Sequence, residues 1–584
     1  MRTVTSRLRI TLLAVFGLAV SGIAIVGTAG PGDAATPPYV VSTQLPLPAG
    51  AANPRINGVG CGAPGFCVAV GSYASGATAV GLIETLSGGH WTATSSPIPA
   101  GASGGSALAG ISCSGSSTCA AWGGYSTGPS TSGYMAVLLS AGQWKATALS
   151  PPLGGTFPSG GYGNNPPIAG IGCSGSGACT IVGNYFDSGN SSRGWVDAYS
   201  GGAWQGARKA VTPPDTTGQG EGLTGLSCGG GLCQAVGTYV NSSGFQSLEI
   251  TVNPDGSMNA PFAGKLPTGA PSAPGLQGIA CSAGGICTGY GEYYSQGNSS
   301  SASDAESYVV GIGGTAFQPQ QPPTTIARSA TIFPSERVFA AGCAGGGCVV
   351  SGVYNDTTGG YHPLLDRFVN GGWVADTAPS TAYPNSIACG AATFCVGVDG
   401  SQSTAPADVL IGSTWTTAPI LLPGNVSGPE VAAQPLACDS ASSCWIVGEY
   451  SSSLFADEVT TTSPPPPNPG VTSGQVASWF HAALVPTGTV AKIENLLKAR
   501  GLTVALNVTR AGTLKIVWTS TRGVIAVTRK VFTRSGRFLV KIALTRTGLS
   551  VLRKVSRLPI KTSATFTVSG HSAVAARGQT VLRR

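Results

Sequence analysis

Short apolar runs separated by turns cover most of the chain, and their lengths predict strands rather than helices. One unit shows the pattern, with apolar strands expected at residues 108–113, 119–125, 134–139 and 143–149 and small or polar residues between them. The unit ends at Ser150-Pro-Pro152. Four short strands joined by turns are what one blade of a β-propeller contains. The hydrophobic pattern therefore predicts an all-β fold.

The unit occurs eight times, and each copy carries a pair of cysteines. The first cysteines of successive pairs lie 46 to 62 residues apart, and strand-patterned periods of about 40 to 50 residues are typical of propeller blades. In seven of the eight units the fourth residue after the second cysteine is Gly and the sixth is Tyr. This even spacing places both on one face of a strand, which fits packing between blades or an aromatic ligand-binding ring; we favour packing. The tyrosines are Tyr73, Tyr125, Tyr185, Tyr239, Tyr293, Tyr354 and Tyr450.

The two ends of the repeat region predict how the ring closes. The last unit has a third strand at residues 454–459 but no fourth strand before the proline-rich segment, whereas a spare strand-like segment lies at 39–45. An N-terminal strand that completes the last blade removes an open sheet edge. We therefore predict an eight-bladed β-propeller over residues 37–462, closed by the N-terminal strand. Seven blades with one stray unit is the alternative.

The first 35 residues have the pattern of an export signal. Arg2, Arg7 and Arg9 precede an apolar run at 10–26, and small residues follow through Ala35, as in a cleaved signal peptide. An uncleaved anchor helix is the alternative, because the run is about long enough to span a bilayer. No later apolar run reaches about 18 residues, so we expect no further membrane span. The protein is predicted to be secreted or associated with the cell wall.

Export determines how the 16 cysteines are interpreted. Six pairs enclose five residues and two enclose four, and an even number at regular spacing in an oxidising compartment indicates disulfides. Zinc is the alternative, but a zinc site needs four converging ligands and the chain has only four histidines. We expect no metal and no cofactor. Because each enclosed loop is short, each bridge is expected mainly to fix its own hairpin. The predicted local disulfides are Cys61/Cys67, Cys113/Cys119, Cys173/Cys179, Cys228/Cys233, Cys281/Cys287, Cys343/Cys348, Cys389/Cys395 and Cys438/Cys444.

A different domain is expected after a proline-rich linker at residues 463–475. Helical spacing appears at 476–484 and 489–497 and again at 547–554. Strand alternation predicts strands at 503–508, 513–518, 524–528, 537–543 and 564–568. We predict a small β-sandwich-like domain with short helices over residues 476–584.

Two stretches resemble known families. The string Cys61-x5-Cys67-Val-Ala-Val-Gly-Ser-Tyr73, with its continuation Ile83–Trp91, is similar to Cys-pair repeats of secreted actinobacterial proteins. This resemblance covers most of residues 39–460 and implies propeller-like architecture. The strings Ala511–Trp518 and Leu544–Leu549 resemble a C-terminal module common in actinobacterial exported proteins, which implies a β-sandwich-like fold. Neither resemblance implies catalytic residues.

Charge is divided unequally between the two predicted domains. Only 9% of the chain is charged. From Val471 onward there are 19 Lys or Arg and a single acid, Glu494, whereas the repeat region has 9 basic residues and, with Asp33 included, 22 acidic residues. A strongly basic exported domain attracts polyanions by summed electrostatics, so anionic cell-wall polymers or glycans are candidate partners. A solvated basic face without a partner is an equal alternative, and the acidic repeat region could also be an internal partner. No specific nucleic-acid partner is expected, because no strand-borne aromatic cluster is present, and we expect a monomer.

Candidate catalytic residues are few. Glu292 and Glu449 occupy the same repeat position, between the Gly and the Tyr, and pairing them with each other or with Asp399 is the catalytic interpretation. The alternative is a solvent-exposed strand position that tolerates polar residues, which we favour. We therefore predict a non-catalytic extracellular binding or scaffold protein, and whether it is an enzyme stays open. The alternative function is a secreted glycan-active enzyme, a glycoside hydrolase or lyase, on a propeller scaffold.

Overall fold

The computed structural model describes residues 38–584 apart from short gaps. The predicted signal peptide and the proline-rich linker lie outside the described residues. The gaps are 129–130, 159–165, 176, 219, 265–266, 268–274, 295–304, 313–319, 326, 328–335, 401–405, 424–434, 462–475, 477–479, 487, 489–491, 509–511, 533–535 and 568–573.

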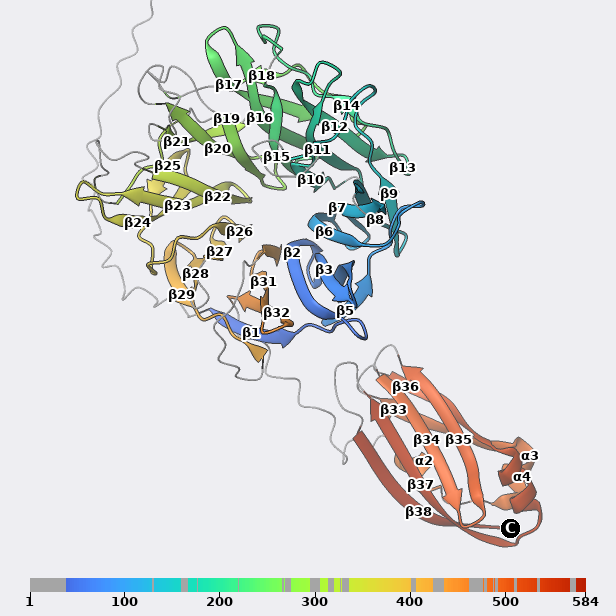
Figure 1. Ribbon diagram of the computed structural model, residues 1–584. Coiled ribbons are helices and arrows are strands. Elements are labelled where there is room, and N and C mark those ends of the chain that lie inside the picture. The colour runs from blue at the N-terminus through green and yellow to red at the C-terminus, as the bar shows by residue number, and fades with distance from the viewer. Residues whose placement is uncertain are drawn as a thin grey trace, which may run out of the picture. The chain divides into compact units, whose positions relative to one another are not determined.

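The described strands up to residue 460 form eight small antiparallel sheets, numbered here 1 to 8 along the chain (Figure 1). Sheet 1 contains β2 (Ala52–Ala63), β3 (Phe66–Ser75), β4 (Thr78–Ser87) and β5 (His90–Ser95). Sheet 2 contains β6 (Ser106–Ser114), β7 (Thr118–Gly128), β8 (Thr131–Ser140) and β9 (Gln143–Ala148). Sheet 3 contains β10 (Gly170–Cys173), β11 (Cys179–Phe186), β12 (Ser192–Ser200), β13 (Ala203–Trp204) and β14 (Arg208–Lys209). Sheet 4 contains β15 (Gly222–Gly229), β16 (Leu232–Asn241), β17 (Gly244–Val252) and β18 (Phe262–Ala263).

The other four sheets repeat this plan. Sheet 5 contains β19 (Gly275–Cys281), β20 (Cys287–Tyr294) and β21 (Ala305–Ile312). Sheet 6 contains β22 (Glu336–Ala344), β23 (Gly347–Asn355), β24 (Tyr361–Val369) and β25 (Gly372–Ala375). Sheet 7 contains β26 (Ser386–Ala391), β27 (Phe394–Val398), β28 (Ala407–Ile411) and β29 (Thr414–Ala418). Sheet 8 contains β30 (Leu436–Ser440), β31 (Ser443–Tyr450), β32 (Ser453–Thr460) and, as its outer strand, β1 (Tyr39–Gln44).

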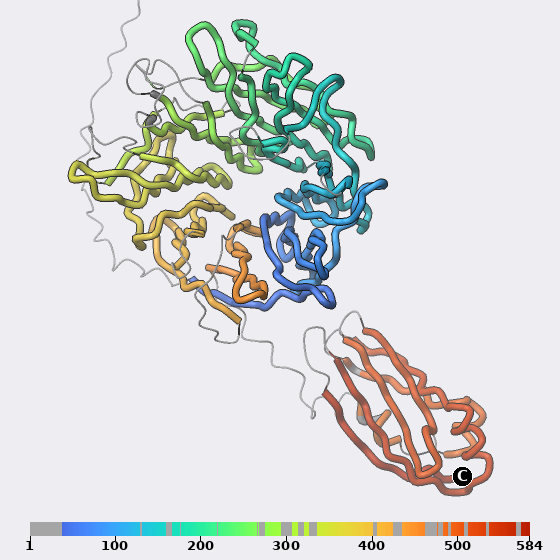
Figure 2. The backbone as a smooth tube through the Cα atoms, in the orientation of Figure 1, coloured from blue at the N-terminus to red at the C-terminus, as the bar shows by residue number. Residues whose placement is uncertain are grey.

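The eight sheets are arranged in a ring, which Figure 2 shows as a closed circuit of the backbone. The first strand of each sheet contacts the first strand of the next, in the order β2, β6, β10, β15, β19, β22, β26, β30, and β30 contacts β2 again. These first strands are therefore the innermost ones. Small antiparallel sheets arranged radially around an axis are the architecture of a β-propeller.

The N-terminal strand closes the ring, as the sequence predicted. β1 pairs antiparallel with β32 from Tyr39 opposite Thr460 to Gln44 opposite Phe455. The Leu45 amide then donates a hydrogen bond to the Leu454 carbonyl at 3.0 Å. Figure 1 shows the blue β1 beside the orange β32. The last sheet is thereby built from both ends of the repeat region, which covers the edge of β32.

All eight predicted disulfides are present, and each links the cysteines of one close pair. Each bridge connects the first two strands of its sheet near their turn; Cys61 and Cys67, for example, lie directly opposite each other in β2 and β3. Every bridge therefore fixes one hairpin and none joins two sheets. The bridges are Cys61–Cys67, Cys113–Cys119, Cys173–Cys179, Cys228–Cys233, Cys281–Cys287, Cys343–Cys348, Cys389–Cys395 and Cys438–Cys444.

The second cysteine of every pair is also a core residue, so fixing a hairpin is only part of what the bridges do. Each of these eight residues is at most 3% exposed, and each packs in a hydrophobic core. The sequence did not indicate this burial, because the spacing of a pair does not reveal on which face of its strand each cysteine lies. The sulfur atoms are thus structural and closed to a ligand. The eight are Cys67, Cys119, Cys179, Cys233, Cys287, Cys348, Cys395 and Cys444.

Hydrophobic cores fill the spaces between neighbouring sheets. Phe66 and Ile83 of sheet 1 pack with Leu108 and Met135 of sheet 2 in one such core. Six of the seven repeated tyrosines are buried, with at most 8% of the residue exposed. Their burial supports packing between blades over the aromatic ligand-binding ring. The six are Tyr73, Tyr185, Tyr239, Tyr293, Tyr354 and Tyr450.

The repeated glycine is explained by close approach of two backbones. A Cβ built on Gly237 would lie 2.0 Å from the Gly222 carbonyl oxygen on the neighbouring first strand. Gly71 and Gly352 would meet the carbonyl oxygens of Arg55 and Arg337 in the same way, at 1.8 and 1.9 Å. Any side chain here would push the second strand away from the first. The Gly in the sequence pattern is therefore a packing requirement of the blade.

The C-terminal strands form one six-stranded sheet rather than the predicted sandwich. Its order is β33-β36-β35-β34-β37-β38, and β35 and β36 pair over only two residues, Ala526 opposite Leu544 and Val527 opposite Ala543. Two stacked sheets were expected because alternation alone does not reveal whether the strand pairs join. The strands are β33 (Gly501–Val508), β34 (Gly512–Ser520), β35 (Gly523–Phe532), β36 (Gly536–Leu544), β37 (Arg557–Thr567) and β38 (Val574–Arg583).

Short helices accompany this sheet, and those whose bounds lie in the described residues are α2 (His481–Leu484), α3 (Ile493–Ala499) and α4 (Arg546–Arg553). The inward sheet face and the helices share one hydrophobic core, which contains Phe480, Trp518 and Phe566. The Trp518 indole N–H donates to the Ala483 carbonyl at 2.9 Å. The core therefore packs against one face of the sheet, and the other face does not contribute to it.

Candidate functional site

The two glutamates that share a repeat position each lie at a seam between neighbouring sheets. Glu449, in sheet 8, accepts a hydrogen bond from the Ile56 amide at 2.9 Å and forms an ion pair with Arg55 of sheet 1 at 3.7 Å. Glu292, in sheet 5, forms an ion pair with Arg337 of sheet 6 at 3.9 Å. Their side chains are 18% and 17% exposed, so the expected solvent-exposed position is wrong.

A third residue at this repeat position also connects two sheets. Asn184 accepts a hydrogen bond from the Leu223 amide at 2.8 Å and donates one to the Leu223 carbonyl at 2.9 Å. Burial raises the pKa of Glu449, while the Ile56 amide and Arg55 oppose that rise. The position thus fastens each of these second strands to the first strand of the next sheet. Glu292 and Glu449 belong to separate seams and do not share one site.

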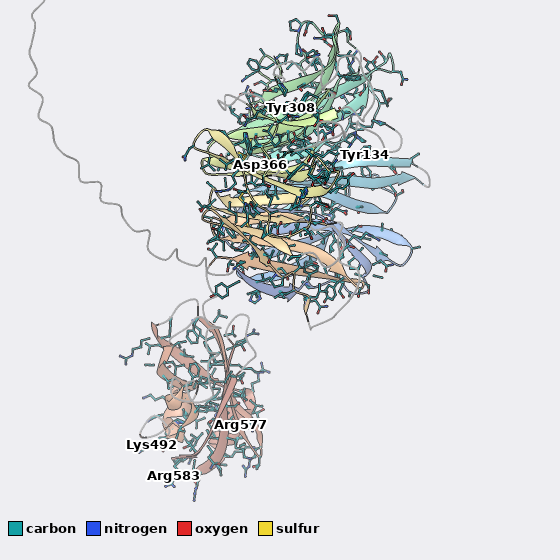
Figure 3. All side chains as sticks on the ribbon, turned by 90° about the vertical axis from the view of Figure 1, so that its left-hand side faces the viewer. Tyr134, Tyr308, Asp366, Lys492, Arg577 and Arg583 are labelled. Carbon is teal, nitrogen blue, oxygen red and sulfur yellow. A yellow bond between two sulfur atoms is a disulfide. The ribbon has the colours of Figure 1, made fainter. Side chains whose placement is uncertain are left out.

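The structure also shows that several acidic residues share a repeat position that the sequence analysis did not identify. In the second strand of each sheet, the residue two positions after the second cysteine pairs with a residue of the third strand. That third-strand residue is acidic in five sheets, and all five are buried. The signal was present in the sequence, but it becomes visible only when third strands are aligned by their pairing register. The five are Glu84, Asp197, Asp366 (labelled in Figure 3), Asp408 and Asp457.

Some of these carboxylates hold the segments beyond the fourth strands. Asp457 accepts from the Leu421 amide at 2.7 Å, and Asp408 accepts from the Ser380 hydroxyl at 3.0 Å. Burial raises the pKa of Asp457 to about 6 and that of Asp408 to about 7. Glu84 is fully buried, and burial raises its pKa to about 8. These acids are held in the sheet interior and present no group to a ligand.

Asp399, the third candidate, lies on a cavity of about 750 Å³ at the inner side of sheets 5, 6 and 7. The residue is 3% exposed, and its carboxylate accepts a hydrogen bond from the Tyr383 amide at 3.3 Å. The cavity, called here the inner-rim cavity, is lined by Gln277, Tyr290, Val338, Phe339, Tyr383, Asn385 and Asp399.

The second candidate site is the side of the C-terminal sheet that faces away from its core, called here the outward face. Along β34, buried Leu514, Ile516 and Trp518 alternate with the outward residues, and β36 and β37 follow the same alternation. Arg577 and Arg583 lie on this face and are labelled in Figure 3. Its charged residues are all exposed and all basic: Lys515, Arg529, Arg537, Lys541, Arg557, Lys561, Arg577 and Arg583.

The strand register places like charges directly opposite each other on this face. Lys515 of β34 is the partner of Arg529 of β35, and Arg557 of β37 is the partner of Arg583 of β38. Like charges in directly opposite positions of an antiparallel pair destabilise the sheet. The single acid after Val471, Glu494, lies on α3 rather than on this face. The face is therefore a concentrated positive surface that its own residues do not neutralise.

Metal binding and membrane crossing find no support in the described part of the chain. There, no three His, Cys, Asp or Glu side chains gather closely enough to hold a metal ion. His362 instead pairs with Asp356 at 2.8 Å and stacks on Tyr354. Within the same residues, none of the helices is long and apolar enough to cross a bilayer.

Comparisons with known proteins add distant likenesses only. No protein-family model matches the chain, and a search of curated proteins finds no match. A solved structure of YCF48 bound to D1 peptide aligns with 72% of this chain and 95% of its own, at 12% identity and a TM-score of 0.33. The β-propeller domain of the Trilobed protease from Pyrococcus furiosus aligns with 62% of this chain and 99% of its own, at 9% identity and a TM-score of 0.36.

A third solved structure, the polysaccharide lyase Uly1, aligns with 68% of this chain and 88% of its own, at 8% identity and a TM-score of 0.36. These likenesses are too distant to transfer an activity, a ligand or a catalytic residue to this chain. Its function has to be inferred from its own residues.

Proposed function

We propose that this protein is an exported, non-catalytic binding protein that attaches to anionic polymers of the cell envelope through its C-terminal domain, residues 476–584. An eight-bladed propeller over residues 37–462 presents a separate recognition surface. The observation that carries the proposal is the outward face, where eight basic residues are exposed and no acidic residue is present.

The spacing of these charges suits a polymer with repeated negative groups. Residues on neighbouring strands lie about 5 Å apart and alternate residues along a strand about 7 Å apart. Both distances are shorter than the Debye length of about 10 Å at 0.1 M salt, so the potentials of neighbouring cations add. A bound polyanion also relieves the repulsion between the opposed pairs Lys515/Arg529 and Arg557/Arg583.

The composition of the face disfavours a single-stranded nucleic acid. The outward positions of its described strands hold no aromatic side chain, and base stacking relies on aromatic side chains. Its exposed apolar residues are aliphatic, with Val531 60% and Leu539 77% exposed. Charge is the main recognition element that this surface offers.

The alternative function is a glycan-active enzyme. Most glycosidases use two carboxyl groups about 5 to 10 Å apart. Among the described residues that line the inner-rim cavity, Asp399 is the one carboxylate, while Glu292 and Glu449 are engaged at separate seams. Binding is therefore the function that the geometry supports best.

The test uses the full chain from residue 36 onward and polyphosphate coupled to polyacrylamide beads, with unmodified beads as the uncharged control. We expect retention on the polyphosphate beads only, and loss of most of it in the Lys515→Glu/Arg529→Glu variant. The matched control is Lys498→Glu/Arg546→Glu, which makes the same charge change in the same domain but on its helices. Equal loss of retention in the two variants would show that net charge, not the outward face, determines binding.

A further inference from the structure

The first strands of several sheets share a β-bulge, which interrupts the regular alternation of side chains between the two faces of the strand. A β-bulge interrupts the first strand of five sheets at an equivalent position, which skips one residue in the pairing. Bulges re-aim side chains and are frequent next to functional sites. The five bulge residues are Asn57, Ala109, Thr224, Gln277 and Phe339.

In two sheets the bulge residue fastens its sheet to the next one. The Asn57 side-chain amide donates to the Leu108 carbonyl at 2.7 Å, and the Thr224 hydroxyl donates to the Leu276 carbonyl at 2.5 Å. The bulge residues of the neighbouring sheets 5 and 6, Gln277 and Phe339, are instead exposed and line the inner-rim cavity. The bulge residue thus connects neighbouring sheets at sheets 1 and 4, whereas at sheets 5 and 6 it lines the cavity.

We propose that the inner-rim cavity binds a neutral sugar residue of a glycan. Sugars offer C–H faces that pack on aromatic rings and hydroxyls that both donate and accept hydrogen bonds. The cavity supplies both kinds of partner: Phe339, 38% exposed, and Tyr383 are aromatic residues of its lining, and the amides of Gln277 and Asn385 can donate and accept. An apolar surface with a few convergent polar groups is the usual composition of a small-molecule site.

The wall of the cavity is held in place by contacts that leave these groups in position. The Tyr290 hydroxyl donates to the Phe339 carbonyl at 3.0 Å, which ties sheet 5 to the bulge of sheet 6. Burial raises the pKa of Tyr290 to about 12, so this hydroxyl keeps its proton. The Asn385 side-chain oxygen accepts from the Gly400 amide at 3.1 Å, which restrains this side chain.

The charge of the lining specifies a neutral ligand. Among the described lining residues are the carboxylate Asp399 and no Lys, Arg or His, so these residues offer an anionic sugar no cation to pair with. This site is separate from the outward face of the C-terminal sheet. The two are therefore expected to bind different polymers independently.

The test is affinity electrophoresis of the full chain through gels that contain mannan, dextran or arabinogalactan. We expect at least one of these neutral polysaccharides to retard the protein, and Phe339→Ala or Asn385→Ala to weaken the retardation about tenfold, which corresponds to the loss of one aromatic or hydrogen-bond contact. Ala109→Ser, at the equivalent bulge of sheet 2, is the matched control and should bind as the unmodified chain does.

Thermal melting of each variant verifies that the exposed substitutions leave the fold intact, and Gln277→Ala replaces any variant that fails. Retardation that persists in Lys515→Glu/Arg529→Glu separates this site from the outward face. The proposal is overturned if none of the three polysaccharides retards the protein, or if the cavity variants bind as the unmodified chain does.

Discussion

Arg55 of the first sheet and Glu449 of the last form an ion pair across the seam where the ring closes, with 3.7 Å between Nη1 and Oε2. The same carboxylate accepts a hydrogen bond from the Ile56 amide at 2.9 Å. Two sets of contacts therefore close the ring. β1 pairs with β32, and Glu449 binds the backbone of Ile56 and the side chain of Arg55 in the neighbouring sheet. A residue singled out as a catalytic candidate thus has a defined place in the architecture.

Glu449→Ala should destabilise the propeller by about 1.5–3 kcal/mol, because it removes a charge-assisted hydrogen bond to a backbone amide. Glu449→Gln retains an oxygen that can accept from Ile56 and loses only the partly exposed ion pair, so it should cost less than about 1 kcal/mol. Urea unfolding of both variants measures the difference. Equal losses would show that the hydrogen bond to Ile56 contributes nothing.

Deletion of residues 36–48 should lower the melting temperature of the propeller by more than about 5 °C, because it removes the whole pairing of β1 and exposes the edge of β32. Calorimetry gives the melting temperature. Val41→Thr, at a 40% exposed position of the same strand, is the control and should melt within about 1 °C of the unmodified chain. Unchanged melting after the deletion would mean that the last sheet is stable without β1.

Gly237→Ala should destabilise the protein by about 1–3 kcal/mol, the usual cost of forcing a methyl group into packed structure. Its Cβ would lie 2.0 Å from the Gly222 carbonyl oxygen. Gly372→Ala is the matched control, because nothing lies within 4 Å of a Cβ built there. Chemical unfolding of the two variants should separate them clearly, and equal stabilities would remove close approach as the reason for the repeated glycine.

Stability should fall as the pH rises between about 4.5 and 8. Burial raises the pKa of Glu84 from 4.5 to about 8, so the folded chain holds a proton there that the unfolded chain releases. Its stabilising contribution is complete below pH 4.5 and is lost as the pH rises through 8, by up to about 1.4 kcal/mol per pH unit. Asp408, with a pKa of about 7, adds to the loss. Hydrogen bonds lower the pKa of Asp356. Its contribution to stability therefore rises with pH, but only in the acid range below its ordinary pKa.

Replacement of Glu84 isolates its share of this pH dependence. Val137 occupies the equivalent position in sheet 2, so Glu84→Val places a residue that the repeat already accepts. Melting temperatures measured from pH 5 to pH 8.5 should fall less steeply in the variant, which should also be more stable at pH 8.5. An unchanged slope would mean that Glu84 is ionised in the folded chain.

The repeat architecture was predictable because its signals are local. Cysteine pairs, apolar runs and turn residues recur in every unit, and the missing fourth strand at one end matches the spare segment at 39–45. The C-terminal domain was harder to predict. Strand alternation identified β33, β34 and β36 and parts of β35 and β37, but β38 was missed. The junction of β35 with β36 is a pairing over two residues that no local pattern encodes.

The candidate sites depended on register, which the sequence does not display. Lys515 and Arg529 are 14 positions apart and become direct partners only through the pairing of β34 with β35. Gln277 and Phe339 reach one cavity because bulges interrupt two separate strands. Asp399 was named from the sequence as a possible partner of Glu292 or Glu449, whereas the aromatic and amide groups around it were not identified.

The most direct test of the proposed function is the salt dependence of full-chain retention on polyphosphate beads between 0.05 and 1 M NaCl. We predict tight retention at low salt and nearly complete release by 1 M, where the Debye length falls to about 3 Å. Lys515→Glu/Arg529→Glu should be released at distinctly lower salt than Lys498→Glu/Arg546→Glu. Retention that persists in 1 M NaCl, or release of both variants at the same salt concentration, would contradict electrostatic attachment through the outward face.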